Sequence, residues 1–334
     1  MTPHVTFLMA VYNGAATVQA AIESVLAQTF SDFEFLIIND ASTDATAAVI
    51  SAFRDPRLRL NTNEKNAGLS ASLNRGLARA RGAFIARMDA DDLCLPHRAA
   101  TQVAFLNAHP EIAAVGSFIE TFSNTSPARE LIKYPTDPAA IAATLLFRNA
   151  LAHPAVMLRK SALDQHALTF PEGYWGAQDY ALWLTCVEQN LPLANLPEVL
   201  LHYRLHQNQL SHSMTRLQSE GTQIRSAFLH NWLGPDVTPE ELTLHDALAQ
   251  NNFTPTAAFI SAAAAWLTKL ATLNQTFPRF DPTALLRILT GRFVALHRFA
   301  SSHNLTPPDI TQTPFAPYLN SNALLNYSPH PRML

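Results

Sequence analysis

An apolar strand pattern runs directly into three carboxylates in residues 83–92, whose sequence is Ala83-Phe84-Ile85-Ala86-Arg87-Met88-Asp89-Ala90-Asp91-Asp92. In extended backbone, residues two apart point to the same side, so Asp89 and Asp91 can face one cation or its water shell. Hard oxygen ligands of this kind select Mg²⁺ or Mn²⁺. A solvated acidic turn after a strand is the alternative for so short a pattern, so the surrounding sequence has to decide.

The same arrangement of a buried strand followed by polar residues occurs twice upstream. Residues 5–11 and 33–38 are near-continuous apolar runs, as expected of strands covered on both faces, and they end in Tyr12-Asn13 and Asn39-Asp40. Apolar residues at helical spacing predict intervening helices, the second of them capped by Ser42 or Thr43. Further predicted elements are a strand at 57–60, a helix at 69–77, a helix from Pro96 to about Ala108 and a strand at 112–119.

Alternating strands and helices predict an α/β fold, a mixed and mostly parallel sheet with helices on both faces. Ligands of such sheets bind beyond the carboxyl ends of the strands. We therefore expect the polar residues after the strands, although far apart in sequence, to meet in one crevice.

The remainder of the chain changes character twice. Residues 123–201 are mixed, with a strand predicted at Pro154–Leu158 and a helix at Gln178–Glu188, whereas Ala/Leu-rich helices follow residue 217. The last residues are rich in Pro, Asn and Ser, which is typical of a loosely ordered tail. These changes predict an α/β domain at 1–215, a helical extension at 216–305 and a tail at 306–334.

The composition excludes several classes. The 334 residues are 48% hydrophobic and 15% charged, and the net charge of −3 shows no basic bias that would favour nucleic acid. No run of about 18 apolar residues predicts a transmembrane helix, and no signal peptide is recognisable. Two cysteines, Cys94 and Cys186, suit a reducing compartment. We expect a cytoplasmic protein, with peripheral attachment at the inner face of the membrane left open.

Taken together, the motifs resemble the GT-A fold glycosyltransferases of family 2 over roughly residues 3–212. The resemblance rests on the order and spacing of many short pieces, which is more specific than any one of them. The pieces are Val11-Tyr12-Asn13-Gly14, Ser24 with Gln28, Asn39 to Asp44, Asn66-Ala67-Gly68, Asn74-Arg75-Gly76, Ala80-Arg81-Gly82, Met88 to Asp92, Pro96, Arg98, Gln102, Gln178-Asp179-Tyr180 and Tyr203-Arg204-Leu205-His206.

The resemblance implies a donor site for a nucleotide-diphosphate sugar. Tyr12 would lie against the base, Asp40 would accept a base N–H, which suits uracil and less selectively thymine, and Arg75 or Arg81 would reach the base or the phosphates. Asp91 would be the main ligand of Mn²⁺ or Mg²⁺. The full set implied on the nucleotide and metal side is Val11, Tyr12, Asn13, Asp40, Arg75, Asp89, Ala90 and Asp91. Taken alone, Tyr12 also fits a strand-end aromatic and Asp40 a helix cap.

On the acceptor side, the resemblance implies that Asp179 is the general base of an inverting transfer. Its alternative role is that of an ordinary acid in the first turn of a helix. The acceptor or diphosphate side would also include Asp92, His153, Trp175, Gln178, Tyr203, Arg204 and His206. The implied acceptor is a glycan or a lipid-linked glycan. Asn39, Ala41 and Gln178 depart from the common pattern, where Asp, Gly and Glu are usual, but none of the three removes a group that the chemistry requires.

Competing functions are less consistent with the sequence. No G-x-G-x-x-G follows the first strand and no G-x-x-x-x-G-K-[ST] loop occurs, which disfavours dinucleotide oxidoreductases and P-loop enzymes. A non-catalytic relative that only binds nucleotide sugars stays open. The C-terminal helices could cover the catalytic domain, form a homo-oligomer or lie on a membrane; the few Lys and Arg beside their apolar faces favour packing or self-association.

Overall fold

The computed structural model describes residues 2–206, 214–311 and 313–318. By its contacts the chain forms two compact units. The first comprises Met1–Thr136 and Ala150–Ser213, and the second Asp137–Asn149 and Met214–Leu334. Residues 137–149 therefore belong with the C-terminal helices, although they lie inside the sequence range 1–215.

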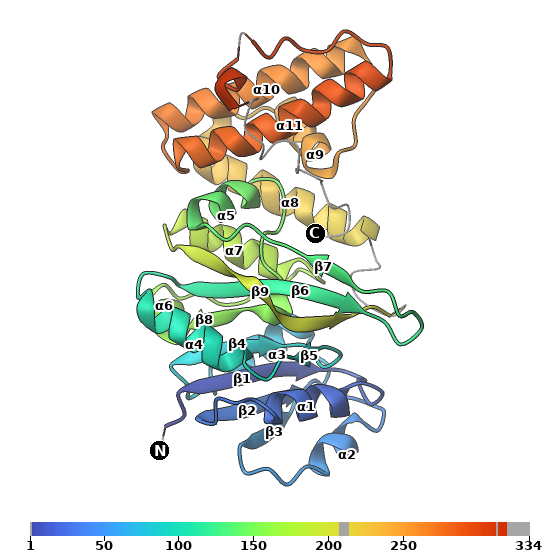
Figure 1. Cartoon of the computed structure of the whole chain (residues 1–334), viewed down its shortest axis with the longest axis vertical. Helices are drawn as coiled ribbons and strands as arrows, with labels where there is room; N and C mark the ends of the chain where they lie inside the picture. The colour runs from blue at the N-terminus through green and yellow to red at the C-terminus, as the bar shows by residue number, and fades with distance from the viewer. Residues whose placement is uncertain (1, 207–213, 312, 319–334) are drawn as a thin grey trace. The chain divides into compact units, whose positions relative to one another are not determined.

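The first unit carries the sheet and its helices (Figure 1). Its strands are β1 (Val5–Val11), β2 (Phe33–Asn39), β3 (Leu58–Thr62), β4 (Phe84–Met88), β5 (Leu93–Cys94), β6 (Ala114–Phe122), β7 (Glu130–Ile132), β8 (Met157–Arg159) and β9 (Leu193–Arg204). Its helices are α1 (Val18–Leu26), α2 (Thr46–Ser51), α3 (Leu69–Leu77), α4 (Arg98–Ala108), η1 (His153–Ala155), α6 (Lys160–Gln165) and α7 (Gln178–Glu188).

The strands form one mixed sheet in the order β3-β2-β1-β4-β8-β6-β9-β5, with β7 paired to β6. The first four neighbours run parallel, as does the long β6–β9 pair, whereas β8 is antiparallel to β4 and β6. The predicted fold class, a mixed and mostly parallel sheet with helices on both faces, is confirmed.

Every residue of β1 and β2 is buried, which explains why their sequences are mostly apolar rather than alternating. Phe7 of β1 packs edge-on against Phe33 of β2, with ring centroids 5.3 Å apart. On α3, a Cβ added to Gly76 would overlap the side chain of Leu8. A glycine at this point lets α3 lie directly on β1 and helps to fix the loop before α3 at the carboxyl end of the sheet.

The position of β5 forces the sheet to curl. Residues Met88 to Leu93 can span at most about 17 Å. Four strand spacings of about 4.8 Å, roughly 19 Å in a flat sheet, separate β4 from β5 in the strand order. The short acidic connection therefore pulls the β9 edge towards the end of β4, and Leu93 pairs with His202 near the end of β9.

Two local predictions were wrong. Helix α2 begins at Thr46, and its first backbone N–H bonds to Asp44 Oδ1 at 3.0 Å, whereas the Ser42 hydroxyl accepts from the backbone N–H of Asn13 instead of capping the helix. The predicted strand at 154–158 is the short helix η1 followed by β8, because Pro154 has no N–H to donate to a sheet ladder.

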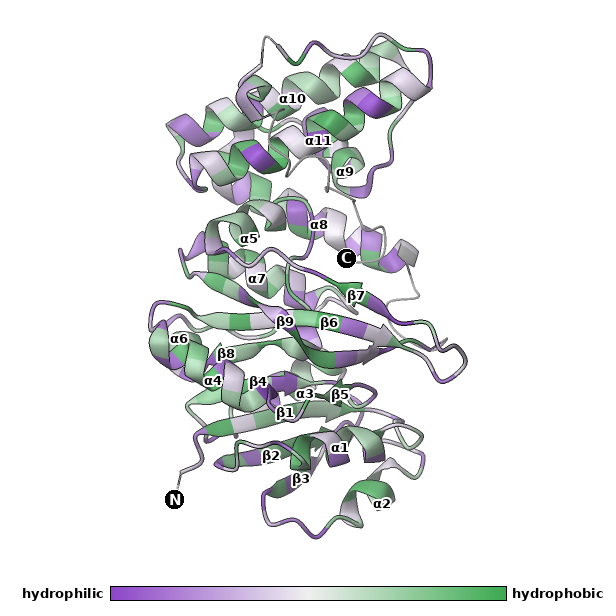
Figure 2. Cartoon of the chain, viewed as in Figure 1, coloured by the Kyte–Doolittle hydropathy of each residue, from purple (hydrophilic) through white to green (hydrophobic). Residues whose placement is uncertain are grey.

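In the second unit, the secondary structure of the described residues is all helical, so the predicted α-helical C-terminal extension is confirmed. It comprises α5 (Pro138–Leu145), α8 (Met214–Leu233), η3 (Gly234–Asp236), α9 (Pro239–Gln250), α10 (Ala257–Thr276), α11 (Pro282–Ser302) and η4 (Ala316–Tyr318). In Figure 2, green and purple segments alternate along α10 and α11, as expected of helices with one buried face. Of the predicted tail at 306–334, Phe315 is fully buried in this unit, and residues 319–334 lie outside the described residues.

Polar side chains of the C-terminal helices capture the end of α5. His245 Nε2 lies 2.8 Å from the Leu146 carbonyl oxygen, and the Trp266 indole N–H donates to His245 Nδ1 at 3.3 Å. Burial lowers the pKa of His245 to about 3, so the neutral imidazole donates from Nε2 and accepts at Nδ1. These bonds explain why residues 137–149 belong to the second unit.

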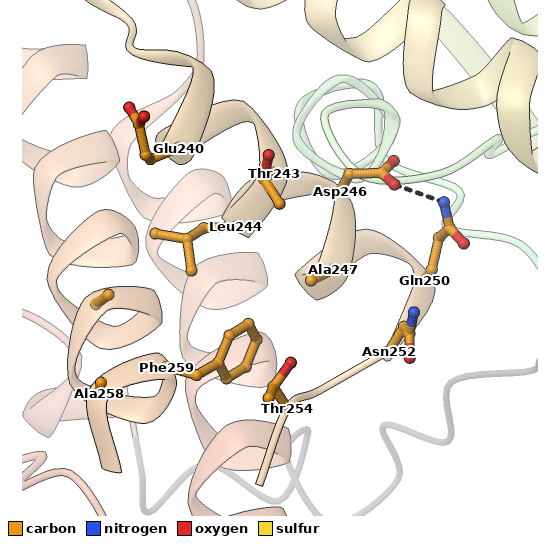
Figure 3. Close-up of a pocket in the computed structure, with 11 residues that line it drawn as sticks. Glu240, Thr243, Leu244, Asp246, Ala247, Gln250, Asn252, Thr254, Ala258 and Phe259 are labelled. Carbon is orange, nitrogen blue, oxygen red and sulfur yellow. Dashed lines mark hydrogen bonds between the residues drawn. The ribbon is translucent and has the colours of Figure 1, made fainter. Parts of the chain in front are cut away.

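A groove of about 570 Å³ runs between α9 and α10 (Figure 3). Its lining combines the apolar side chains of Leu244 and Phe259 with polar ones, of which Asp246 accepts a 2.7 Å hydrogen bond from Gln250. Within the described residues, no helix combines the length and hydropathy needed to cross a bilayer.

Candidate active site

Three carboxylates gather beyond the carboxyl end of β4. Asp89, Asp91 and Asp92 each offer an oxygen within 4.8 Å of the other two. Hard oxygen donors at this spacing suit Mg²⁺ or Mn²⁺, which bind through one or two carboxylates plus substrate phosphates. The predicted Asp-x-Asp pair is thus assembled as a candidate metal centre, with Asp92 as a third acid beside it.

Asp89 is held by an arginine that the sequence analysis did not single out. Arg87 of β4 is 2% exposed, and its guanidinium forms an ion pair with Asp89 Oδ2. A charged residue within an otherwise apolar strand was the available signal, because a buried charge normally requires a partner.

Asp91 faces the end of β9. Its Oδ2 lies 2.8 Å from His206 Nε2, and its backbone carbonyl accepts from Arg204 Nε at 2.6 Å. Burial raises the pKa of Asp91, and the negative charge of Asp89 raises it further. The hydrogen bond from His206 only partly offsets these effects. A divalent cation would supply the compensation that the protein itself leaves incomplete.

Asp92 is fully buried and bonds across the sheet. Its Oδ1 accepts from the backbone N–H of Arg204 at 2.8 Å, so Asp92 connects the acidic loop to the end of β9. Its Oδ2 has no hydrogen-bond partner within the described part of the chain. Burial raises the pKa of Asp92 well above its usual value, with Asp91 and Asp89 adding to the shift.

Arg204 connects the end of β9 to the acidic loop through several of its N–H groups. In addition to its bonds to the acidic loop, Nη1 donates to Asn124 Oδ1 at 2.6 Å, and the guanidinium lies 4.5 Å from the centre of the Phe122 ring. Arg204 is 7% exposed, and its neighbour Tyr203 is half-buried. In this state the side chain of Arg204 is committed to protein oxygens.

The loop after β1 is fastened to the loop after β2. Val11, at the end of β1, is buried, and its carbonyl accepts from the Asp40 backbone N–H at 2.8 Å. Asn13 has a left-handed φ of 53°, and its side-chain oxygen accepts from the Thr43 backbone N–H at 2.8 Å. Tyr12, between them, is 50% exposed and presents an open aromatic face.

The carboxylate of Asp40 is enclosed by the loop before α3. It accepts from Asn63 Nδ2 at 2.7 Å and from the backbone N–H groups of Ala67 and Gly68, each at 2.8 Å. Gly68 has a φ of 86°, a conformation that glycine adopts without strain. Asn63 was missed in the sequence, where nothing marked it apart from its place after a short strand.

The two basic candidates lie in different places. Arg75 is exposed on α3, whose N-terminal loop encloses Asp40. Arg81 forms an ion pair with Glu34 at 2.7 Å. This pair lies near the amino ends of the strands, whereas the acidic loop follows the carboxyl end of β4. Only Arg75 therefore remains a candidate for contact with a ligand.

Three of the acceptor-side candidates, Trp175, Gln178 and Asp179, lie at or just before the start of α7. Gln178 and Asp179 are 2% and 7% exposed, and Asp179 lies in the first turn of the helix. Trp175 in the preceding loop is half-buried. His153 is buried near the Phe170 ring, and burial together with the charge of Arg87 holds the pKa of its imidazole well below the usual value.

Other residues of the quoted motifs support the scaffold. Arg98 Nη2 donates to the carbonyl oxygens of Arg87 and Val156 at 2.7 and 3.1 Å. Gln102 Nε2 donates to the carbonyls of Val115 and Ala155. Buried backbone carbonyls need such donors, so these side chains fix the strands beneath the acidic loop.

Known proteins are similar to this chain in sequence. A family model for glycosyl transferase family 2 matches residues 6–167. An uncharacterized glycosyltransferase of Haemophilus influenzae is 32% identical over 228 residues, 65% of this chain and 70% of the relative. The UDP-Glc:alpha-D-GlcNAc-diphosphoundecaprenol beta-1,3-glucosyltransferase WfgD of Escherichia coli is 28% identical over 229 residues, 68% of this chain and 87% of the relative.

Solved structures agree on the fold. S. aureus TarS 1-349 in complex with UDP-GlcNAc superposes with a TM-score of 0.57 at 17% identity, over 90% of this chain and 88% of TarS. The mannosyltransferase PcManGT from Pyrobaculum calidifontis, in complex with GDP-Man and Mn²⁺, has a TM-score of 0.57 at 18% identity, over 91% of this chain and 84% of PcManGT. Motif order, fold and sequence similarity lead to one conclusion: the chain belongs to glycosyltransferase family 2.

Proposed function

We propose that this glycosyltransferase moves a sugar from a UDP-sugar to a hydroxyl group of a glycan or lipid-linked glycan, with inversion at the anomeric carbon. The observation that carries the proposal is the cluster of Asp89, Asp91 and Asp92 within 4.8 Å at the carboxyl end of β4. Its carboxylates alone would repel a diphosphate, so the cluster makes chemical sense with a bridging cation.

Asp91 is proposed as the main ligand of Mn²⁺ or Mg²⁺, with Asp89 as a second acid beside the ribose or the ion. The bound ion would neutralise the charge that develops on the departing diphosphate. PcManGT, which shares the fold, was solved with Mn²⁺. His206, already bonded to Asp91, would orient that carboxylate from the end of β9.

The preference for uracil rests on Asp40. A carboxylate offers about four acceptor sites, and three are taken by Asn63, Ala67 and Gly68. One remains, which matches the single N–H on the pairing edge of uracil, whereas guanine presents two N–H groups there. WfgD is named for UDP-Glc and TarS was solved with UDP-GlcNAc, whereas PcManGT was solved with GDP-Man. Tyr12, half exposed beside this loop, would stack on the base.

Asp179 is proposed as the general base. At the N-terminus of α7 its carboxylate is favoured as the anion, because the helix dipole stabilises negative charge there. It would accept the proton of the acceptor hydroxyl as that oxygen bonds to the anomeric carbon. The bond from this carbon to the diphosphate oxygen breaks on the opposite face, so the configuration inverts.

The remaining assignments complete the proposal. Val11, Asn13, Ala90 and Arg75 would line the nucleotide; Asp92, His153, Trp175, Gln178, Tyr203, Arg204 and His206 would serve the acceptor or the diphosphate. Residues 1–215 would hold the catalytic machinery and 216–305 a helical extension that packs or self-associates, in a cytoplasmic or membrane-peripheral protein. A relative that binds nucleotide sugars without transfer is the second candidate, favoured by no specific observation.

The decisive experiment is thermal stabilisation by UDP, GDP and TDP, each with and without Mn²⁺. A ligand at a hundred times its Kd adds about 2.7 kcal/mol to the free energy of unfolding, which raises the melting temperature measurably. We expect stabilisation by UDP that requires Mn²⁺. The Asp91→Ala variant should lose both this response and sugar transfer, whereas Asp55→Ala, which removes a surface ion pair with Arg57, should keep both.

The outcomes separate the parts of the proposal. A response to GDP rather than UDP would overturn the assignment of Asp40 to uracil. Near-normal transfer by Asp91→Ala would overturn the metal site. Binding of UDP without hydrolysis or transfer across a panel of UDP-sugars and glycan acceptors would favour the non-catalytic relative.

A further inference from the structure

Arg87 carries a buried positive charge whose role no other feature of the site explains. It is the only charged side chain of β4 and is 2% exposed. Within the described part of the chain, its Nε and Nη1 make no aligned hydrogen bond, although Nη1 forms the ion pair with Asp89 Oδ2. Its backbone carbonyl is pinned by Arg98. The backbone of Arg87 is therefore fixed by Arg98, and its guanidinium is linked to the rest of the site through charge.

A buried arginine is costly, and in proteins it cannot escape that cost by losing its proton. The same unit contains a useful contrast in Glu34, a buried acid paired with two arginines. There, Arg81 and Arg59 are 54% and 34% exposed, so their charges stay in contact with water. Arg87 is the member of its pair that is buried, whereas Asp89 is 30% exposed and faces outward. In this ion pair the buried charge of Arg87 lies behind the more exposed carboxylate of Asp89, which faces the site.

Resting on the proposed function, we infer that Arg87 is a positioning residue that anchors Asp89 and sets the charge of the candidate metal site. In the metal-free protein its charge lets the three acids lie within 4.8 Å of one another. It also holds Asp89 back from full coordination of the ion, which leaves that role to Asp91. Arg87 itself touches neither donor nor acceptor.

The test compares Arg87→Met and Arg87→Lys with the native chain, each alone and combined with Asp89→Asn. Arg59→Met is the matched control, because it removes an arginine from a carboxylate at the opposite edge of the same sheet. Two quantities are measured for each protein: the melting temperature without metal, and the affinity for Mn²⁺ in the presence of UDP by electron paramagnetic resonance.

Removing Arg87 should tighten Mn²⁺ binding by roughly tenfold, since one unit charge a few ångströms from the ion disappears and Asp89 is released to coordinate it. Arg87→Lys, which keeps the charge, should stay within about twofold of the native affinity. In the Asp89→Asn background, the Arg87→Met effect should shrink, because the partner through which Arg87 acts is gone. Arg59→Met should leave the affinity for Mn²⁺ unchanged.

Equal changes in Mn²⁺ affinity in both backgrounds, or weaker Mn²⁺ binding in Arg87→Met, would overturn the inference. If Arg87→Met does not fold, the Arg87→Lys variant and the doubly neutral Arg87→Met/Asp89→Asn variant still decide it, since replacing both members of a buried pair is commonly tolerated. Failure of the native protein to bind Mn²⁺ would refute the proposed metal site. In that case, non-additive effects of Arg87→Met and Asp89→Asn on the melting temperature would still support the anchoring of Asp89 by Arg87. Additive effects would refute this anchoring as well.

Discussion

Buried acids at opposite ends of the strands, Glu34 on one side and Asp91 with Asp92 on the other, are compensated by their neighbours to different degrees. Near the amino ends of the strands, Glu34 accepts hydrogen bonds from Thr6, Arg59 and Arg81. Burial alone would raise the pKa of Glu34, but these hydrogen bonds more than offset it, and the pKa is lowered. Beyond the carboxyl ends of the strands, burial raises the pKa of Asp91 and Asp92, and the hydrogen bonds to these residues do not offset the increase.

This contrast separates a structural acid from candidate functional ones. A carboxylate that only holds the fold together is compensated by the fold itself. Carboxylates left under-compensated are kept at a cost in stability, and such sites occur where a ligand completes the compensation. The difference supports the proposal that the ligand binds at the carboxyl ends of the strands, on grounds separate from the motifs.

The largest effect is expected from Asp179→Asn, in the first turn of α7, where we propose the general base. If Asp179 is the general base, kcat should fall by roughly a hundredfold to ten-thousandfold. The stabilisation by UDP with Mn²⁺ should persist, because the amide keeps the shape of the site. Transfer rates and melting temperatures measured on the same preparation check both parts.

The matched control for this prediction is Asp164→Asn, which removes an exposed acid paired with Lys160 on α6. It should leave kcat unchanged. Normal transfer by Asp179→Asn would place the base elsewhere and reduce Asp179 to an acid in the first turn of a helix.

The contrast between Glu34 and Asp92 is tested by comparing the free energies of unfolding of Glu34→Gln and Asp92→Asn. The first should lower the free energy of unfolding by about 3 kcal/mol, because it leaves two arginines beside a neutral amide. The second should leave it unchanged or raise it, because it removes a buried, repelled charge, while transfer activity falls. Denaturant titrations at pH 7 measure both.

The pH dependence has a definite sign at Glu34. Because its pKa in the folded protein is lowered from 4.5, its contribution is fully present above about pH 5 and is lost as the pH falls through the folded value. The stability difference between the native chain and Glu34→Gln should therefore shrink on acidification. A difference that is constant from pH 7 to pH 3 would contradict the ionic account of this cluster.

The smallest effect is expected from Asn63→Ala at the base pocket. Removing the Asn63 amide frees a second acceptor site on Asp40. The ratio of the Kd values for GDP and UDP should therefore fall by roughly tenfold, the value of one hydrogen bond to a charged group. Calorimetric titration with Mn²⁺ measures the ratio; Asn61→Ala, on the neighbouring strand β3, is the control and should not change it.

The sequence predicted more of the secondary structure than of the side-chain contacts within the site. Strands β1, β2 and β4 were recognised because both faces are covered, so nearly every side chain is apolar. Helix α7 was predicted with the bounds that it has, Gln178–Glu188. The predicted cap of α2 was wrong, because the Ser42 hydroxyl accepts from the backbone N–H of Asn13 in a distant loop. The predicted continuous strand at 154–158 was wrong, because Pro154 has no N–H to donate to a sheet ladder.

The sequence by itself determined strands β1 to β4 and β6, the helical extension and the acidic residues after β4, because hydrophobic periodicity and short polar motifs are local properties of the chain. Only the tertiary structure decided the partners: Arg87 for Asp89, His206 for Asp91, Arg204 for Asp92 and Asn63 for Asp40. It also decided that residues 137–149 join the C-terminal helices. Three of these four pairings join segments more than twenty residues apart, and curling of the sheet, which no local pattern encodes, brings the end of β9 beside the acidic loop.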